Sequence, residues 1–304
     1  MSIESLQGPQ SGTRGTASST HRTVDANLRD QLPNLIIVGA MKCGTTSLHY
    51  YLSLHPDIRM SREKEIEFFI EERRWNRGPA WYARQFDARG RVRGESSPNY
   101  TATRRFPGVA GRIRDIVPDA RLIFMVRDPI ERLVSHWVHN FTHGRERRSF
   151  VEILADDRYL ERSMYAVQLE PYLERFPREQ ILIIEMEHLR ARRLDVLRDV
   201  FTFLDVNADF VSPRFGVERH RTERKRVKTN AGRWIASTRF AHWVESLPQP
   251  IRWPARDLLY YPFSRPLVRP VLDSAQRSPL VEILQPDAAR FRTMSGLACE
   301  SWSL

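Results

Sequence analysis

Three short apolar runs stand out along the chain, at residues 35–38, 121–126 and 180–185. A continuous apolar run of this length is typical of a strand that is buried on both faces of a parallel sheet. Residues 92–95 form a further, shorter strand candidate. The pattern therefore predicts the strands of a buried, parallel sheet.

Segments with helical spacing of apolar residues lie between these runs. Residues 44–54 are expected to form a helix, because Leu48, Tyr51 and Leu52 fall at positions i, i+3 and i+4. Residues 163–176 precede the last strand and are predicted to be helical as well. The tail from 279 to 296 predicts one or two further helices.

Another helix is expected directly after the run at 121–126. Asp128 can cap it, and Pro129 suits its first position. Its apolar residues repeat on one face: Ile130, Leu133, Val134, Trp137, Val138 and Phe141. Strands that alternate with helices indicate a P-loop-like, three-layer α/β/α fold whose central sheet is mostly parallel and doubly wound.

Two segments of the chain do not follow this alternation of strands and helices. Residues 1–30 are rich in Ser, Thr, Gly and Gln without an apolar period, so we expect a disordered tail before a single domain at 31–304. Within that domain, residues 246–280 are rich in proline and aromatic residues, and we expect an irregular segment. This segment either wraps the domain or borders an acceptor cleft.

Composition narrows the class of protein. The chain has 304 residues, a formal net charge of +11 and two cysteines. Two cysteines are too few for a disulfide framework, and no leader or membrane-spanning run is visible. We therefore expect a cytoplasmic location. Peripheral contact with a membrane stays open. The dense basic run at 219–228 has no interleaved aromatic residues, which argues against nucleic acid and leaves a small polyanion as the partner for the charge.

A glycine-flanked turn with phosphate-binding chemistry follows the first strand. It comprises Gly39, Ala40, Met41, Lys42, Cys43, Gly44, Thr45, Thr46 and Ser47. Free amides at a helix N-terminus, the helix dipole, one lysine and three hydroxyl groups all favour an anion. The order of residues is not that of a Walker A motif, because the lysine precedes the second glycine and no Gly-Lys-Ser/Thr follows.

A second candidate site follows the strand at 121–126. Arg127 can bind a phosphate through two parallel hydrogen bonds, and Ser135 lies off the apolar face of the helix that follows. Both lie at the carboxyl end of a strand, where open α/β sheets bind ligands. Taken alone, the pair is equally compatible with a structural ion pair at Arg127 and a solvated serine.

Together these segments resemble sulfotransferases that use PAPS (3'-phosphoadenosine 5'-phosphosulfate), in particular the heparan-sulfate-type branch and its bacterial relatives. The resemblance covers residues 32–203 and resumes near 279. It is carried by GAMKCGTTSLHYYLSLHPDI, KEIEFF, GESSPNY, RLIFMVRDPIERLVSHW, RSMYAVQLEPYLERFPREQILII and LVEILQPDAARFRTMSG. It implies transfer of a sulfuryl group from PAPS, with PAP (3'-phosphoadenosine 5'-phosphate) as product, to a hydroxyl or amine of a carbohydrate, glycolipid or small metabolite.

The resemblance also implies roles for individual residues. The segment from Lys42 through Cys43, Gly44, Thr45 and Thr46 to Ser47 would hold the 5'-phosphosulfate, with Lys42 on the bridging oxygen. Arg127 and Ser135 would hold the 3'-phosphate, which distinguishes PAPS from ATP. A basic loop closes over the nucleotide in related enzymes, and Lys225 and Arg226 fall near its position, although the glycine of that loop is missing here.

The acceptor side contains the expected catalytic base. Glu65 falls where the family keeps this base, and Glu67 is its nearest rival, since both side chains would point the same way in an extended segment. Glu95 is expected at a strand end that lines the cleft, while Ser97 is either on the acceptor side or structural. Ser96 stands where related enzymes often have a lysine.

Two rival functions remain at this stage. A P-loop kinase or other NTPase would use ATP and Mg²⁺, but Gly-Lys-Ser/Thr is absent and no carboxylate is recognisable as a magnesium ligand, so we expect no metal. A catalytically silent binding protein on the same scaffold would be expected to lack Lys42 or Glu65, and both are present.

Overall fold

The computed structural model describes residues 26–217, 226–247, 255 and 258–304. Its centre is a sheet of five strands in the order β2-β3-β1-β4-β5. The strands are β1 (Leu35–Gly39), β2 (Ile58–Met60), β3 (Val92–Ser96), β4 (Arg121–Val126) and β5 (Ile181–Glu185). Every neighbouring pair in this sheet is parallel, which confirms the predicted fold class.

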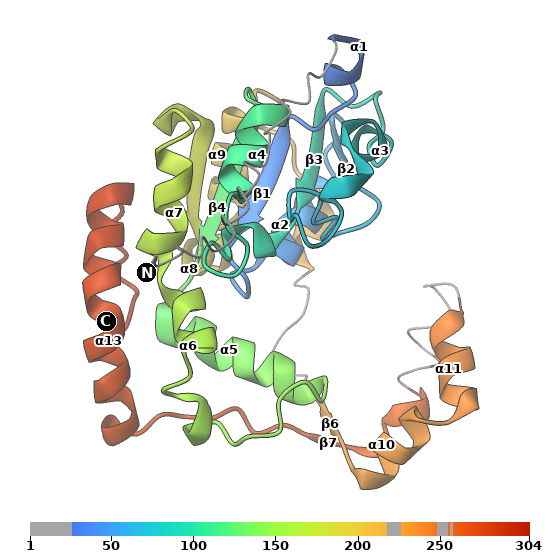
Figure 1. The fold of residues 1–304 in the computed structure, drawn as a ribbon, viewed down its shortest axis with the longest axis vertical. Helices are drawn as coiled ribbons and strands as arrows, with labels where there is room; N and C mark the ends of the chain where they lie inside the picture. The colour runs from blue at the N-terminus through green and yellow to red at the C-terminus, as the bar shows by residue number, and fades with distance from the viewer. Residues whose placement is uncertain (1–25, 218–225, 248–254, 256–257) are drawn as a thin grey trace, which may run out of the picture.

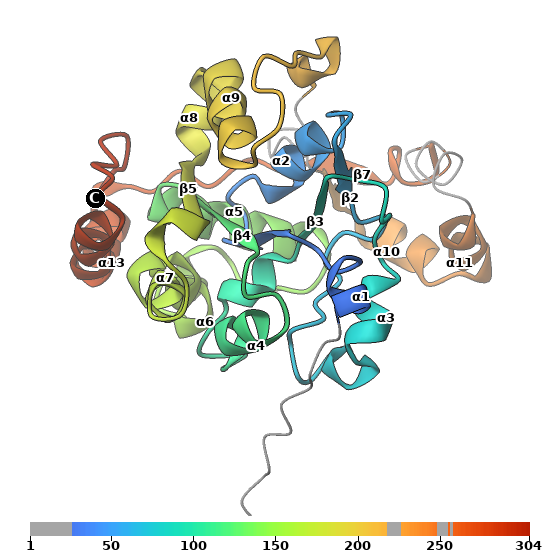
Figure 2. The same ribbon diagram turned by 90° about the horizontal axis from the view of Figure 1, so that it is seen from above.

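Helices cover both faces of the sheet, as the near-complete burial of β1 and β4 requires. In Figure 2, α2 (Thr45–Leu52), α8 (Met186–Ala191) and α9 (Arg193–Phe203) lie on one side, and α4 (Val109–Ile116) and α7 (Tyr165–Leu173) on the other. Two short helices, α1 (Ala26–Arg29) and α3 (Pro79–Ala83), flank the β2 edge. The main hydrophobic core fills the space between these layers.

A second, smaller core lies beside the sheet and is organised by α5 (Pro129–Thr142). As predicted, the Asp128 side chain caps α5 and Pro129 is its first residue. The apolar face of α5 packs with residues of α6 (Asp157–Leu160) and of α13 (Ser274–Ser295). α13 is one continuous helix despite Pro279 and Pro286, and a capping box at Asp273 fixes its start.

Short 3-10 turns connect the larger elements. They are η1 (Trp75–Arg77), η2 (Pro98–Thr101), η3 (Val151–Ile153), η4 (Glu161–Ser163), η5 (Arg178–Gln180) and η6 (Pro213–Gly216). η2 follows β3 directly, so it continues from the carboxyl end of the sheet.

The described residues between 226 and 271 form an arm that extends from the body of the molecule (Figure 1). A two-stranded antiparallel ribbon of β6 (Arg226–Lys228) and β7 (Ser264–Pro266) joins it to the rest. Beyond the ribbon lie α10 (Asn230–Ala236) and α11 (Arg239–Ser246), set apart from the sheet in Figure 1. The expected irregular segment at 246–280 therefore also contains the strand β7 and the first turns of α13, while residues 248–254, 256 and 257 lie outside the described residues.

The structure describes the start of the predicted domain but not most of the segment before it. Most of the expected disordered tail, residues 1–25, lies outside the described residues, and α1 begins at Ala26. No helix in the described part of the chain is long and apolar enough to cross a membrane. The cytoplasmic location and the single domain at 31–304 stay predictions.

Candidate functional site

The two predicted phosphate-binding segments meet at one edge of the sheet. β1 and β4 are parallel neighbours, so their carboxyl ends bring the turn after Gly39 next to Arg127. A cavity of about 450 Å³ opens there, a size typical of small-molecule sites. Of the predicted donor-site residues, Lys42, Gly44, Thr45, Thr46, Ser47, Arg127 and Ser135 all line it, together with the expected base Glu65.

The turn after β1 is shaped to present amides to an anion. Lys42 and Gly44 both have left-handed backbones, with φ of 70° and 91°. Gly44 is the N-cap of α2 and contributes no side chain to cap it, while the first amides of any α-helix lack acceptors within the helix. A side chain at position 44 would be strained at this φ, which explains the glycine.

The charge around the cavity is strongly asymmetric. Its basic side chains are Lys42, Arg127, Arg145, Arg190 and Arg193, and its only carboxylate among the described residues is that of Glu65. His139 and His143 lie beside them, with ring centroids 4.3 Å apart. Such a concentration of cations favours a ligand with several negative charges.

Arg127 is held in place before any ligand binds. Its side chain is almost completely buried, and its guanidinium donates to Oε2 of Glu131 at 2.9 Å. The same carboxylate also accepts from the guanidinium of Arg269, which precedes α13. Nε of Arg127 is buried and has no hydrogen-bond partner among the described residues. The ion pair that the sequence left open therefore exists, and part of the guanidinium remains for a ligand oxygen.

Asp128 makes three hydrogen bonds that hold the turn carrying Arg127 in place. One carboxylate oxygen of Asp128 caps α5 by accepting from the amide of Glu131 at 2.8 Å, and the other accepts from the amide of Ser303. The amide of Asp128 itself donates to Glu187 at 3.2 Å. Ser135 lies one turn beyond Glu131, on the same face of α5. The segment is thus rigid where it faces the cavity.

Glu65 also lines the cavity, and its backbone conformation is unusual. Its φ is 67°, a left-handed value that is rare for a residue with a side chain and often marks a functional site. Its amide donates to the carbonyl of Ser96 at 3.0 Å, which ties the loop to the end of β3. Its carboxylate is half-exposed and accepts from Nζ of Lys64 at 2.7 Å.

Glu67 does not point the same way as Glu65, so the assumption of an extended segment is wrong. Its φ is also left-handed, at 55°, and its side chain is buried rather than on the cavity wall. Its carboxylate accepts from the Asn99 amide and forms an ion pair with Arg73 at 2.9 Å. Only Asn99 of this group lines the cavity. Glu67 as a substrate ligand stays a prediction.

Glu95 and Ser97 are completely buried behind the cavity wall. The carboxylate of Glu95 accepts from Tyr82, from Ser97 at 2.6 Å and from Tyr100 at 2.9 Å. Burial raises the pKa of Glu95 in spite of these donors. Oγ of Ser97 accepts from the amide of Glu67 at 3.1 Å, so the pair supports the loop that carries Glu65. In this conformation neither reaches the cavity, and their contact with an acceptor stays a prediction.

Cys43 is the one donor-loop residue whose side chain turns inward. It is fully buried, and Sγ lies 3.2 Å from the hydroxyl of Tyr165 on α7. Burial raises the pKa of the Cys43 thiol to about 11, so it is an inert packing residue rather than a nucleophile. Only its backbone can serve the loop.

Of the predicted nucleotide lid, Arg226 is among the described residues, and it does not line the cavity. Lys225 lies outside the described residues. Arg226 lies in β6, where its guanidinium donates to Ser264 and stacks on the ring of Tyr261, 4.1 Å from the centroid. A lid role for Arg226 stays a prediction and requires the ribbon to move.

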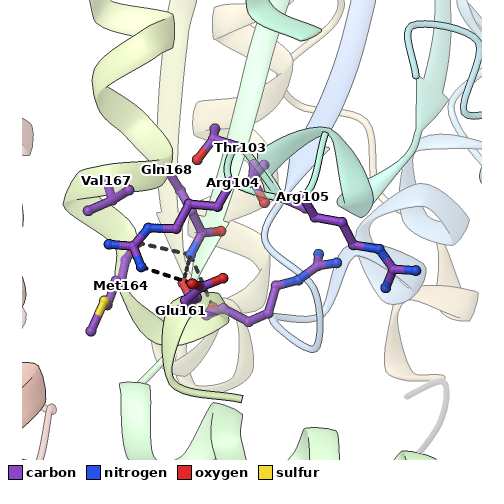
Figure 3. A pocket seen from close by; sticks show the side chains of 10 residues that line it. Thr103, Arg104, Arg105, Glu161, Met164, Val167 and Gln168 are labelled. Carbon is purple, nitrogen blue, oxygen red and sulfur yellow. Dashed lines mark hydrogen bonds and ion pairs between the residues drawn. The ribbon is translucent and has the colours of Figure 1, made fainter. Parts of the chain in front are cut away.

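A smaller crevice near η2 does not offer a second substrate site. Figure 3 shows it between Thr103, Arg104 and Arg105 on one side and Glu161, Met164, Val167 and Gln168 on the other. Its volume of about 20 Å³ holds a single water molecule. Arg104 and Glu161, which both line it, form an ion pair of 2.8 Å, and its small volume leaves no room for a substrate.

Several cavity residues were not predicted from the sequence. His139 and His143 follow Ser135 at steps of four residues, so the spacing on α5 could have revealed them. Arg190 and Arg193 come from α8 and α9, which the sequence analysis did not identify. In the part of the chain that the structure describes, no cluster of three or more His, Cys, Asp or Glu is placed to hold a metal ion.

Comparison with known proteins agrees with the geometry. The model of the sulfotransferase domain family matches residues 32–234. The solved structure of a sulfotransferase from Alicyclobacillus acidocaldarius is 28% identical, with a TM-score of 0.65, and the match covers 90% of this chain and 99% of that one.

Curated relatives are similar over a more limited region. Heparan sulfate glucosamine 3-O-sulfotransferase 3B1 of Mus musculus is 32% identical over 197 residues, which are 61% of this chain and 49% of that protein. The bifunctional heparan sulfate N-deacetylase/N-sulfotransferase 3 of Mus musculus is 30% identical over 205 residues, which are 60% of this chain and 23% of that protein. The chain thus spans half or less of the length of these relatives.

Proposed function

Because this chain belongs to the sulfotransferase domain family and is therefore a sulfotransferase, we propose that its donor is PAPS and that Glu65 is the base that activates the acceptor. The observation that carries the proposal is the convergence of three groups on one cavity: the Lys42 loop, the Arg127 and Ser135 pair, and Glu65. The two cationic groups suit a nucleotide with phosphate at both ends, and the carboxylate suits the acceptor side.

The described residues fit the donor well. The amides at the start of α2 and the hydroxyl groups of Thr45, Thr46 and Ser47 would hold the 5'-phosphosulfate. The buried, unpartnered Nε of Arg127, with the hydroxyl of Ser135 two turns along α5, would hold the 3'-phosphate. ATP has no 3'-phosphate, so this second group would distinguish the two nucleotides.

When bound, PAPS supplies an activated sulfuryl group: the acceptor oxygen or nitrogen forms a bond to sulfur as the bond from sulfur to the 5'-phosphate oxygen breaks, and PAP leaves. Lys42 places positive charge where negative charge accumulates on the leaving oxygen, as cations do in phosphoryl transfer. Glu65 accepts the proton that the acceptor loses. Both residues have left-handed backbones, and both line the cavity.

The acceptor is a hydroxyl or amine of a carbohydrate, a glycolipid or a small metabolite. The names of the curated relatives, which refer to heparan sulfate, support a carbohydrate. Related enzymes often have a lysine at the position of Ser96. Here the Ser96 side chain is buried and has no hydrogen-bond partner among the described residues. An acceptor less anionic than heparan sulfate fits this change.

The proposal is tested by a matched pair of variants, Glu65→Gln and Glu67→Gln. Transfer from radiolabelled PAPS to a panel of glucosamine oligosaccharides and glycolipids would be measured, along with PAP affinity. We expect Glu65→Gln to keep its PAP affinity while turnover falls by about 10²–10⁴-fold, the usual contribution of a general base. Normal turnover in Glu65→Gln and loss of turnover in Glu67→Gln would move the role of base to Glu67.

A further inference from the structure

The arm at residues 226–271 exposes aromatic side chains that the catalytic site does not use. Thirteen large apolar side chains are exposed among the described residues, and eight of them lie in the arm. They are Trp234, Phe240, Trp243, Leu258, Tyr261, Phe263, Val268 and Val271. The exposed residues elsewhere are all aliphatic and scattered, which is ordinary for a protein surface. Of the residues that the structure describes, all five large aromatic residues that are exposed therefore lie in the arm.

Helix α11 shows that these residues are not needed to hold the arm together. Ala241 and Val244 of this helix are buried, and α11 contacts α10. Phe240 and Trp243, each one position earlier, are more than half exposed. Their rings stack on each other, with centroids 5.7 Å apart and planes 29° apart. Positions 240, 241, 243 and 244 lie on one side of the helix, so the described part of the chain covers only part of the apolar stripe of α11.

The arm is also basic. Residues 226–271 contain eight lysine and arginine residues and two acidic residues. Arg239 and Arg265 are exposed, and Arg239 directly precedes Phe240. Adjacent arginine and aromatic residues on an amphipathic helix are typical of a helix that lies in the headgroup region of a bilayer. The same excess of positive charge disfavours pairing of two arms, because like charges would face each other.

From these observations we propose that the arm docks on the surface of an anionic lipid bilayer. Phe240 and Trp243 enter the boundary between headgroups and acyl chains, and Arg239 and Arg265 contact lipid phosphates. The ribbon β6–β7 joins the arm to the body close to α5, and His139 of α5 and His143 at its C-cap line the cavity. Docking therefore holds the catalytic domain near the membrane without inserting it.

The experiment is co-sedimentation of the full chain with vesicles of phosphatidylcholine alone and of phosphatidylcholine mixed equally with phosphatidylglycerol. We expect binding to the anionic vesicles and little to the neutral ones, with affinity that falls as salt rises. The double variant Phe240→Ser/Trp243→Ser is expected to bind anionic vesicles about tenfold or more weakly, because both apolar side chains are lost. Arg239→Glu is expected to weaken binding mainly at low salt.

A matched control removes exposed apolar residues from the body instead of the arm. Val151→Ser/Val211→Ser changes side chains that are 57% and 63% exposed and should bind vesicles as the unmodified chain does. PAP affinity, measured for every variant, shows whether each one is folded. Absence of binding to anionic vesicles, or equal loss in the control variant, would overturn the proposal.

Two further outcomes would assign the arm to another partner. If light scattering shows a dimer that Phe240→Ser/Trp243→Ser converts to a monomer, a second copy of the chain covers the arm. If a single-stranded oligonucleotide displaces the protein from anionic vesicles and its binding needs the same two residues, the arm is a nucleic-acid surface. Either result overturns the lipid proposal.

Discussion

Arg127 donates a hydrogen bond of 2.9 Å to Glu131, four residues later in the chain, and this contact orients the guanidinium before a ligand arrives. The Arg127–Glu131 ion pair has two opposing effects on the binding of an anionic ligand. Glu131 holds Arg127 in place, and it also puts a negative charge beside the proposed 3'-phosphate site. Because Arg269 binds the same carboxylate, the segment before α13 is linked to this site.

Replacing Glu131 with glutamine separates these two effects. Glutamine keeps a hydrogen-bond acceptor for Arg127 and removes the negative charge, so we expect PAP to bind more tightly, by about threefold to tenfold, which corresponds to ~1 kcal/mol for a partly exposed charge. Isothermal titration with PAP measures the change. Glu170→Gln, which removes a carboxylate paired with Arg290 on another part of the surface, is the control. Weaker binding in Glu131→Gln would mean that its charge is required to orient Arg127.

Ser97 is expected to act as a positioning residue for the loop that carries Glu65. Ser97→Ala removes both the acceptor for the amide of Glu67 and one donor to Glu95, at a cost of about 1–3 kcal/mol in the free energy of unfolding. We expect kcat to fall while PAP affinity is unchanged, with partial rescue by Ser97→Thr. Ser96→Ala is the matched control, because Oγ of Ser96 has no partner within the described residues. Equal effects at positions 96 and 97 would contradict this role.

His136 is predicted to make the protein sensitive to acid. Burial, reinforced by the charge of Arg132, lowers the pKa of His136 to about 2 from an ordinary value of 6.5. The unfolded chain therefore takes up a proton first as pH falls, so stability is complete above pH 6.5 and is lost below it, by at most about 1.4 kcal/mol per pH unit. Urea unfolding measured between pH 7 and 4 should show that the free energy of unfolding falls less steeply with falling pH in His136→Gln than in the unmodified chain. An equally steep loss of stability in His136→Gln would contradict this account.

Glu95 is expected to show the opposite dependence. Burial raises its pKa, so the folded state retains a proton that the unfolded chain has released. Its contribution to stability is therefore complete below the ordinary pKa of about 4.5 and is lost as pH rises through the raised value. The difference in free energy of unfolding between the unmodified chain and Glu95→Gln should fall with rising pH across this window. A difference that is independent of pH would show that folding does not change the pKa of Glu95 and would contradict this prediction.

The sequence predicted the parts of the site that depend on local structure. Lys42 and Arg127 directly follow apolar strands, and the carboxyl ends of parallel strands meet at one edge, so their approach follows from the strand pattern alone. Asp128 and Pro129 likewise define the start of α5 by local capping chemistry.

The parts that depend on tertiary packing were not predictable. Glu65 and Glu67 diverge because both have left-handed backbones, which no periodicity reveals. Glu95 is at the predicted strand end, but Tyr82 from α3 and Tyr100 from η2 enclose it. Residues 246–280 were expected to be irregular because of their prolines, and the strand β7 within them is recognised only through its pairing with β6.

The most direct test of the donor assignment is a pair of calorimetric titrations of the unmodified chain, one with PAP and one with ATP and Mg²⁺. If Arg127 and Ser135 bind a 3'-phosphate, PAP should bind about tenfold to a hundredfold more tightly than ATP with Mg²⁺, the value of one or two charge-assisted hydrogen bonds. Arg127→Lys, which keeps the charge but not the paired geometry, should remove most of this preference. Absence of PAP binding, or a preference for ATP with Mg²⁺, would contradict the assignment.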